Sequence, residues 1–112
     1  MVSQYIPARG DIVKLNFDPT LGKERTGYRP ALILATKEFN KATGLALACP
    51  ITSKIKGLNL EVVLPDGLIT NGAVLAFQVK TIDWVERQVK YIESLPDETI
   101  EEVISKLQVL LG

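Results

Sequence analysis

Hydrophobic and polar positions along the first ninety residues form a series of short segments with strand spacing. Residues 11–17 alternate, with apolar side chains at Val13, Leu15 and Phe17, which predicts a half-buried strand. Residues 31–35 are continuously apolar, which predicts a strand buried on both faces. Further strands are predicted at residues 45–53, 61–64, 73–77, 79–84 and 89–91.

The C-terminal residues have helical spacing instead. Pro96 suits a first helical turn with Ser94 or Leu95 as the N-cap, and Asp97 and Glu98 oppose the positive end of the helix dipole. One apolar stripe follows, made of Ile100, Val103, Ile104, Leu107, Leu110 and Leu111.

Two smaller features complete the predicted elements. Thr36 is placed to cap a helical turn over residues 37–41, which Gly44 ends, and Pro50 marks an edge or a bulge of its strand. Short strands closed by one amphipathic helix predict a mainly β fold with α structure, a small curled β-barrel with the helix packed on it. At 112 residues we expect a single domain over residues 1–112.

Composition excludes several classes of function. The formal net charge is zero, which argues against bulk electrostatic capture of nucleic acid, although residues 1–60 carry nine Lys/Arg against four Asp/Glu and residues 61–112 carry four against nine. There is no histidine, so neither histidine acid–base catalysis nor the commonest metal ligand is available. Cys49 is the only cysteine, and there is no signal peptide and no apolar run of about 18 residues, so we expect a cytoplasmic protein.

The loop between the first two predicted strands concentrates charge. Residues 22–30 contain two glycines, one glutamate, one lysine and two arginines, whereas a loop that only reverses the chain needs little more than Gly with Asn or Asp. Gly22 and Gly27 permit positive φ and close approach of the backbone. Pro30 holds Arg29 in extended geometry. These features predict a loop that binds an anion.

Five short motifs stand at residues 9–12, 17–20, 22–30, 50–52 and 77–82, ahead of the terminal helix. Together, in this order and at this spacing, they resemble MazF/PemK-type toxins of bacterial toxin–antitoxin pairs. The resemblance implies an SH3-like barrel, the fold shared with CcdB-type gyrase poisons, and a homodimer. It also implies an endoribonuclease that needs no metal or other cofactor, cuts single-stranded RNA such as mRNA at short sequences, and is neutralised by a cognate antitoxin.

The resemblance implies that Arg29, Thr52 and Glu24 are the catalytic residues. RNA carries its own nucleophile, so cleavage needs an oriented 2′-OH, a proton acceptor, a proton for the 5′ leaving oxygen, and donors to the phosphorane. Arg29 offers a planar fork of donors and Thr52 a hydroxyl donor. Glu24, ionised at neutral pH, is either the base or the group that orients Arg29. As alternatives, Arg29 and Glu24 form a surface ion pair, and Thr52 is an ordinary strand threonine.

The remaining candidates would bind RNA. They are Lys23, Arg25, Tyr28, Phe17, Ser53, Lys54, Lys56 and Gln78. The basic side chains suit a phosphate backbone, or they are solvated loop charges. Tyr28 and Phe17 offer faces on which bases can stack, with core packing as the other reading of Phe17. Gln78 either reads a base edge or caps a strand. Cys49 is expected to be a small core residue, and Trp84 a core or dimer contact.

One position departs from the family pattern, and two rival functions stay open. Arg25 occupies a loop position where the family often has glutamine, so no base preference is carried over. The first rival is a protein-binding poison of gyrase with the same fold, whose key residues would lie near the end of the C-terminal helix. The second is an RNA-binding module that does not cut. If the chain is a toxin, an acidic, partly disordered antitoxin segment would lie across the basic loops.

Overall fold

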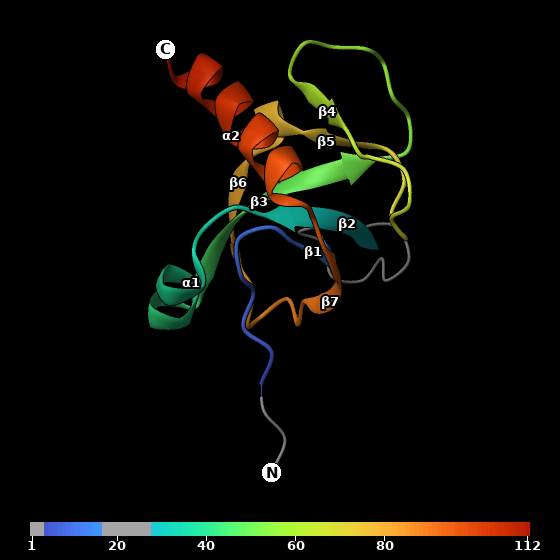
Figure 1. Ribbon diagram of the computed structural model, residues 1–112. Helices are drawn as coiled ribbons and strands as arrows, with labels where there is room; N and C mark the ends of the chain where they lie inside the picture. The colour runs from blue at the N-terminus through green and yellow to red at the C-terminus, as the bar shows by residue number, and fades with distance from the viewer. Residues whose placement is uncertain (1–3, 17–27) are drawn as a thin grey trace.

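A seven-stranded antiparallel sheet forms the body of the protein, in a computed structural model that describes residues 4–16 and 28–112 (Figure 1). The strands are β1 (Asp11–Asn16), β2 (Tyr28–Ile33), β3 (Leu45–Thr52), β4 (Glu61–Val63), β5 (Ala73–Leu75), β6 (Lys80–Asp83) and β7 (Lys90–Ser94). The helices are α1 (Lys37–Thr43) and α2 (Asp97–Leu111), with one 3-10 turn, η1 (Ala76–Gln78). The predicted class, mainly β with α structure, is confirmed, and the curled sheet is consistent with an SH3-like barrel.

Strand β3 is central because one of its edges has two partners. Along that edge residues 45–48 pair with β6 and residues 51–52 pair with β5, while the other edge pairs with β2. Pro50 therefore lies in a central strand, at the point where the neighbour of β3 changes from β6 to β5. The prediction that Pro50 marks a strand at the edge of the sheet is wrong. The amide of Leu34 donates to Leu47 O at 2.8 Å. Because bonded pairs alternate along an antiparallel ladder, the nitrogen of Pro50 faces the edge between β6 and β5, where its missing N–H breaks no ladder.

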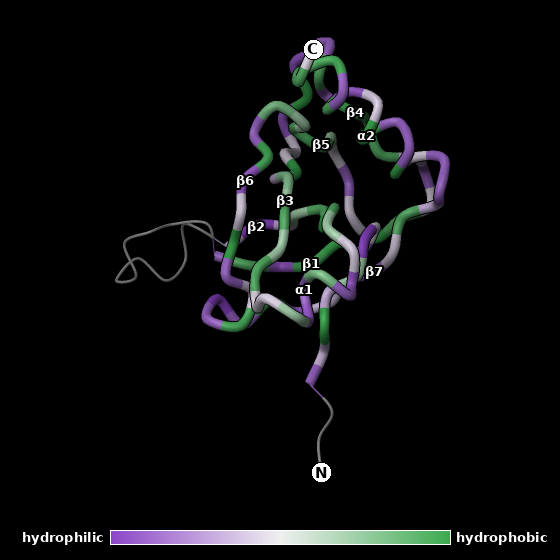
Figure 2. Tube along the Cα trace, turned by 90° about the vertical axis from the view of Figure 1, so that its left-hand side faces the viewer, coloured by the Kyte–Doolittle hydropathy of each residue, from purple (hydrophilic) through white to green (hydrophobic). Residues whose placement is uncertain are grey.

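Two apolar clusters lie on opposite faces of the central strands. One contains Ile12, Leu32 and Cys49, and the other contains Val13 and Ile33. Figure 2 shows the hydrophobic colouring that follows β1 and β3 through the middle of the molecule. The prediction that residues 31–35 are buried on both faces is confirmed. The alternation predicted for the first strand holds at residues 13–16, where Val13 and Leu15 are buried and Lys14 is exposed. Ile12, on the opposite face, is also buried, because it packs in the same cluster as Ile100 and Val103 of α2.

Helix α2 packs through the first four residues of its predicted stripe, Ile100, Val103, Ile104 and Leu107. Ile100 and Val103 are buried in the same cluster as Ile12, whereas Leu111, in the last turn, is 84% exposed. The helix begins one residue later than expected, with Pro96 as the N-cap rather than Ser94 or Leu95. The reason is tertiary: Ser94 ends β7 by hydrogen-bonding Asp11, and Leu95 is a core residue whose amide donates to Gly10 O at 2.9 Å.

Helix α1 ties the N-terminal segment to the second cluster. Thr36 Oγ1 accepts from Phe39 N at 3.3 Å and Gly44 ends the helix at φ +73°, as predicted. Asn40 is fully buried and donates from Nδ2 to Pro7 O at 2.8 Å and to Ala35 O at 3.1 Å. Trp84 Nε1 donates to Asn40 O at 2.9 Å, and its ring packs in the core, which confirms the core reading of that residue.

Three element boundaries differ from the sequence prediction. Strand β2 begins at Tyr28 rather than at residue 31, because Tyr28 pairs with Asn16 of β1. Residues 76–78 form η1 rather than the end of a strand, and the last strand extends to Ser94 because it pairs with β1. In the described part of the chain, neither helix is long and apolar enough to cross a membrane.

Cys49 gives the folded protein a defined response to alkaline pH. The thiol is fully buried, and burial raises its pKa from 9.0 to about 12. Between these values the thiol ionises in the unfolded chain but not in the folded chain, so the free energy of unfolding falls as pH rises above about 9. The slope for this single group reaches about 1.4 kcal/mol per pH unit. Urea unfolding of the parent and of Cys49→Ala from pH 8 to 11 measures it; parallel pH profiles would contradict the prediction.

Candidate active site

Two adjoining pockets form one groove at the C-terminal end of β3. The first has a volume of about 320 Å³ and is lined by Arg29, Pro30, Ile51, Thr52, Ser53, Lys54 and Asn71. The second has a volume of about 360 Å³ and is lined by Thr52, Lys54, Lys56, Leu58, Glu61, Leu75, Phe77 and Gln78. Thr52 and Lys54 belong to both pockets, and we call the combined surface the Thr52 groove.

The Thr52 groove brings together much of the predicted site. Of the candidate residues, it contains Arg29, Thr52, Ser53, Lys54, Lys56 and Gln78. These residues come from β2, from the end of β3 and the loop after it, and from η1, so residues almost fifty positions apart in the sequence meet at one surface.

The pairing of β2 with β3 explains why Arg29 and Thr52 share the first pocket. Ala31 lies opposite Pro50. The same register continued by two residues sets Arg29 opposite Thr52. Hydrogen-bonded and non-hydrogen-bonded pairs alternate along an antiparallel ladder, and Leu34 with Leu47 is a hydrogen-bonded pair. Arg29 and Thr52 are therefore a non-hydrogen-bonded pair, the kind in which facing side chains approach most closely. Arg29 is exposed and Thr52 is half-buried, so a guanidinium and a hydroxyl are both available to a ligand in the pocket.

Thr52 is held from two sides. Its Oγ1 accepts the amide of Lys54 at 3.1 Å, which uses a lone pair and leaves the hydroxyl proton to be donated elsewhere. Gly72 packs directly on its backbone: a Cβ at that glycine would stand 2.0 Å from Thr52 O. Thr52 also pairs with Ala73 of β5. The hydroxyl is therefore presented from a fixed position.

Glu61 organises the basic loop that follows Thr52. It is 8% exposed, and its Oε1 accepts the amides of Lys56, Gly57 and Leu58 at 3.2, 2.9 and 3.2 Å. Sequence analysis identified Glu61 only as the start of a strand and missed this role. The available signal was a carboxylate at the first position of an apolar strand, four residues after the glycine of a basic turn.

Glu93, on β7, holds the loop between β4 and β5. It accepts the amides of Ile69 and Thr70 at 3.0 and 2.7 Å. Burial alone would raise the pKa of the Glu93 carboxyl, but these hydrogen bonds outweigh it and lower the pKa below its ordinary value. The loop then delivers Asn71 to the first pocket. Sequence analysis read Asn71 only as part of a turn.

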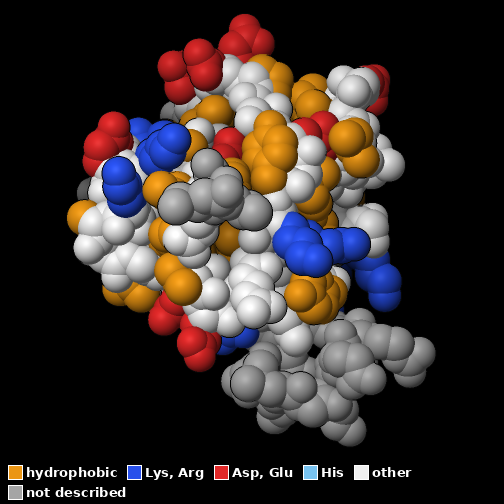
Figure 3. Space-filling model, turned by 90° about the horizontal axis from the view of Figure 1, so that it is seen from below, with side chains coloured by type: hydrophobic (Ala, Val, Ile, Leu, Met, Phe, Trp, Pro, Cys, Tyr) orange, Lys and Arg blue, Asp and Glu red, His pale blue; other side chains and the backbone are white. Residues whose placement is uncertain are grey.

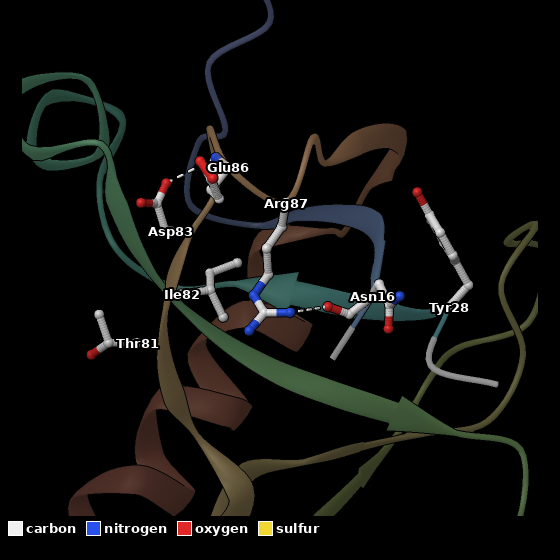
Figure 4. A pocket seen from close by; sticks show the side chains of 7 residues that line it. All are labelled: Asn16, Tyr28, Thr81, Ile82, Asp83, Glu86 and Arg87. Atoms are coloured by element: carbon white, nitrogen blue, oxygen red, sulfur yellow. Dashed lines mark hydrogen bonds between the residues drawn. The ribbon is translucent and has the colours of Figure 1, made fainter. Parts of the chain in front are cut away.

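The structure does not bring Tyr28 into the Thr52 groove. Successive residues of a strand point to opposite faces, and Tyr28 lines a separate pocket of about 470 Å³ with Asn16 and Arg87. Figure 4 shows Arg87 reaching toward Asn16, whose backbone oxygen it hydrogen-bonds, with Tyr28 beyond it. Phe17, Lys23, Glu24 and Arg25 lie outside the described residues, so their predicted roles stay predictions.

Charges of both signs share the lower face of the molecule. Figure 3 shows Lys and Arg side chains in several separate groups there, with Asp and Glu side chains beside them. The unequal charge of the two halves of the sequence therefore does not become one wholly basic face in this view. Among the described residues, no three carboxylate or cysteine side chains gather to hold a metal ion.

A curled antiparallel sheet that offers a guanidinium, a hydroxyl and two ammonium groups along one groove defines a small, mainly β protein suited to a phosphodiester chain. Comparison with known proteins makes the class specific. The chain belongs to the family of PemK-like, MazF-like toxins of type II toxin–antitoxin systems, which it matches over residues 8–111.

Individual relatives are similar to this chain over nearly its whole length. The endoribonuclease toxin MazF of Escherichia coli K12 is 40% identical over 112 residues, which cover all of both chains. A crystal structure of MazF from Deinococcus radiodurans is 43% identical with a TM-score of 0.89, over 97% of this chain and 99% of that one. A MazE–MazF crystal structure from the same organism is 41% identical with a TM-score of 0.87, over 97% of this chain and 98% of that one.

Gly72→Ala should displace the backbone of Thr52. The new methyl group would meet Thr52 O, and φ at this position is +123°, so we expect the free energy of unfolding to fall by about 1–3 kcal/mol. The amide resonances of Thr52 and Ser53 should shift. Gly67→Ala is the matched control, because φ there is +94° but nothing lies within 4 Å of the added carbon. Unchanged Thr52 resonances in Gly72→Ala would contradict the contact.

Proposed function

We propose that this protein is an endoribonuclease toxin that cleaves single-stranded RNA in the Thr52 groove. The observation that carries the proposal is the presence of Arg29 and Thr52 in one pocket, from neighbouring strands. The relatives in E. coli named endoribonuclease MazF, ChpB and PemK, at 36–40% identity, support the same activity.

The proposed chemistry uses the nucleophile of the substrate. The 2′-OH attacks the adjacent phosphorus and gives up its proton, the bond between phosphorus and the 5′ oxygen breaks, and that oxygen takes up a proton. The products therefore carry a 2′,3′-cyclic phosphate and a 5′-hydroxyl. Arg29 and Thr52 donate to the non-bridging oxygens as charge develops on them. In this scheme Arg29 serves as a donor, because the guanidinium carries five N–H donors and no acceptor. Glu24 remains the proposed base or the group that orients Arg29. No step of this scheme requires a metal ion.

The second pocket gives the RNA a continuation beyond the scissile phosphate. Lys54 and Lys56 would follow the backbone, while Phe77 and Gln78 offer an apolar surface and an amide to a base. Selection of short sequences would then arise from the part of the groove that lies away from the reacting phosphate.

Partners follow from the family. The MazE–MazF complexes of Deinococcus radiodurans pair that toxin with an antitoxin, and we propose that a cognate antitoxin neutralises this chain by covering the groove. We also propose a homodimer. The large apolar side chains left exposed in the last turn of α2, with Leu110 at 46% and Leu111 at 84%, are in keeping with a further contact. The proposed location is the cytoplasm, where mRNA is found.

Cleavage of a labelled single-stranded RNA in excess EDTA tests the function. We expect the parent to cut at a subset of sites and to leave 2′,3′-cyclic phosphate ends by mass spectrometry. Removing one donor to the phosphorane, in Thr52→Val or Arg29→Ala, should lower kcat about 10²–10³-fold. Thr81→Val and Lys41→Ala, exposed positions outside the groove, are the matched controls and should cut normally.

Two outcomes would contradict the proposal in different ways. Uncut RNA together with stalled gyrase would identify the protein-binding poison. RNA that binds without being cut would identify the non-cleaving module. A substrate with a single 2′-deoxy substitution at the cut site should resist the parent enzyme, and its cleavage would exclude attack by the 2′-OH.

A further inference from the structure

The loop between β3 and β4 is built around a carboxylate. Four contacts join the Glu61 side chain to the loop: Oε1 accepts from the amides of Lys56, Gly57 and Leu58, and Oε2 from Lys56 at 3.3 Å. The amide of Glu61 closes the turn by donating to Leu58 O at 3.1 Å. Consecutive backbone N–H groups directed at one point form an anion-binding nest, and here the anion is the protein's own side chain.

The geometry of the loop depends on Gly57. Its φ is +75°, and its N–H makes the shortest of the contacts to Glu61, at 2.9 Å. Open space surrounds the position where a Cβ would stand. Glycine is thus required here by the backbone conformation that directs three amides inward, and not by crowding.

The other end of the loop is held by Thr52, whose hydroxyl oxygen accepts the amide of Lys54. The backbone N–H groups of Lys54 and Lys56 are therefore satisfied by Thr52 and Glu61. Both lysine side chains are exposed and line the Thr52 groove. The carboxylate is bound to backbone amides rather than to these ammonium groups, so their charge stays available to a ligand.

We propose that Glu61 is a positioning residue that sets RNA affinity by presenting Lys54 and Lys56 to the phosphate backbone. The inference rests on the proposed function and deepens it. Glu61 does not act as an acid or base, because its oxygens are taken up by amides of its own loop. Arg29 lies on β2, outside this loop, and the backbone of Thr52 is held by Gly72 and by pairing with β5, neither of which involves the amides that Glu61 binds. Loss of the carboxylate should therefore weaken substrate binding and leave the chemical step intact.

The first test is a split between KM and kcat. Glu61→Gln turns one acceptor oxygen into a donor facing other donors, and we expect KM for single-stranded RNA to rise about tenfold with kcat unchanged. The slope of log KM against log salt should become shallower by about 0.7 for each lysine withdrawn from the RNA. A purely structural role would leave this salt slope at its parent value, and that result would overturn the proposal.

The second test acts on the loop without touching Glu61. Gly57→Ala strains the nest but adds a methyl group that meets nothing, so KM should rise several-fold at constant kcat. Gly44→Ala imposes the same kind of strain, at φ +73° with only an ordinary contact to Val85 at 3.9 Å, at the end of α1 and outside the groove, and should leave KM unchanged. Equal KM values for the two glycine variants would overturn the proposal, even if Glu61→Gln failed to fold.

Chemical rescue provides the third test. Glu61→Ala empties the nest of amides, and sodium acetate should refill it and lower KM toward the parent value, whereas sodium chloride of equal ionic strength should not. Glu61→Gln, whose side chain still fills the space, should show no rescue. Failure of acetate to act on a folded Glu61→Ala variant would count against the nest. If the parent itself leaves RNA uncut, it is the proposed function that fails, and the two results are thereby distinguished.

Discussion

The pairing of β2 with β3 is the constraint on which the rest of the structure depends. Leu32 and Cys49 face one apolar cluster, while Ala31 and Ile33 face the other. A shift of one residue would exchange the two sets and move every side chain of the strand to the opposite face. The core therefore selects one register, and the same register carries Arg29 to the level of Thr52. The proposed catalytic pair is a consequence of packing that takes place several residues away.

The walls of the groove follow a second principle, that of backbone hydrogen bonding. Loops beside a site have N–H groups that must find acceptors, and here carboxylates of the sheet provide them. Glu61 accepts the amides of the basic loop, and Glu93 accepts those of the loop between β4 and β5. The carboxylates are thereby bonded to backbone N–H groups rather than to lysine side chains. The ammonium groups of Lys54 and Lys56 keep their positive charge toward the groove. This arrangement explains how a chain with zero net charge can present a locally basic surface.

The chemistry available at the site is shaped by the absence of histidine from the sequence. With an RNA substrate this is no handicap, because the nucleophile is part of the substrate and the protein has mainly to position it and offset charge. In the proposed mechanism, the half-buried hydroxyl of Thr52 on β3 and the exposed guanidinium of Arg29 on β2 share the task of offsetting charge.

The sequence by itself determined the type of nearly every element, because periodicity, the Thr36 cap and the glycines act locally. It also singled out Arg29 and Thr52 through short motifs. Only the tertiary structure decided that Pro50 lies in a central strand, that Tyr28 belongs to another pocket, and that Glu61 holds the basic loop. These depend on which edges pair and which amides face inward. Such contacts join residues far apart in the chain, and no local pattern encodes them.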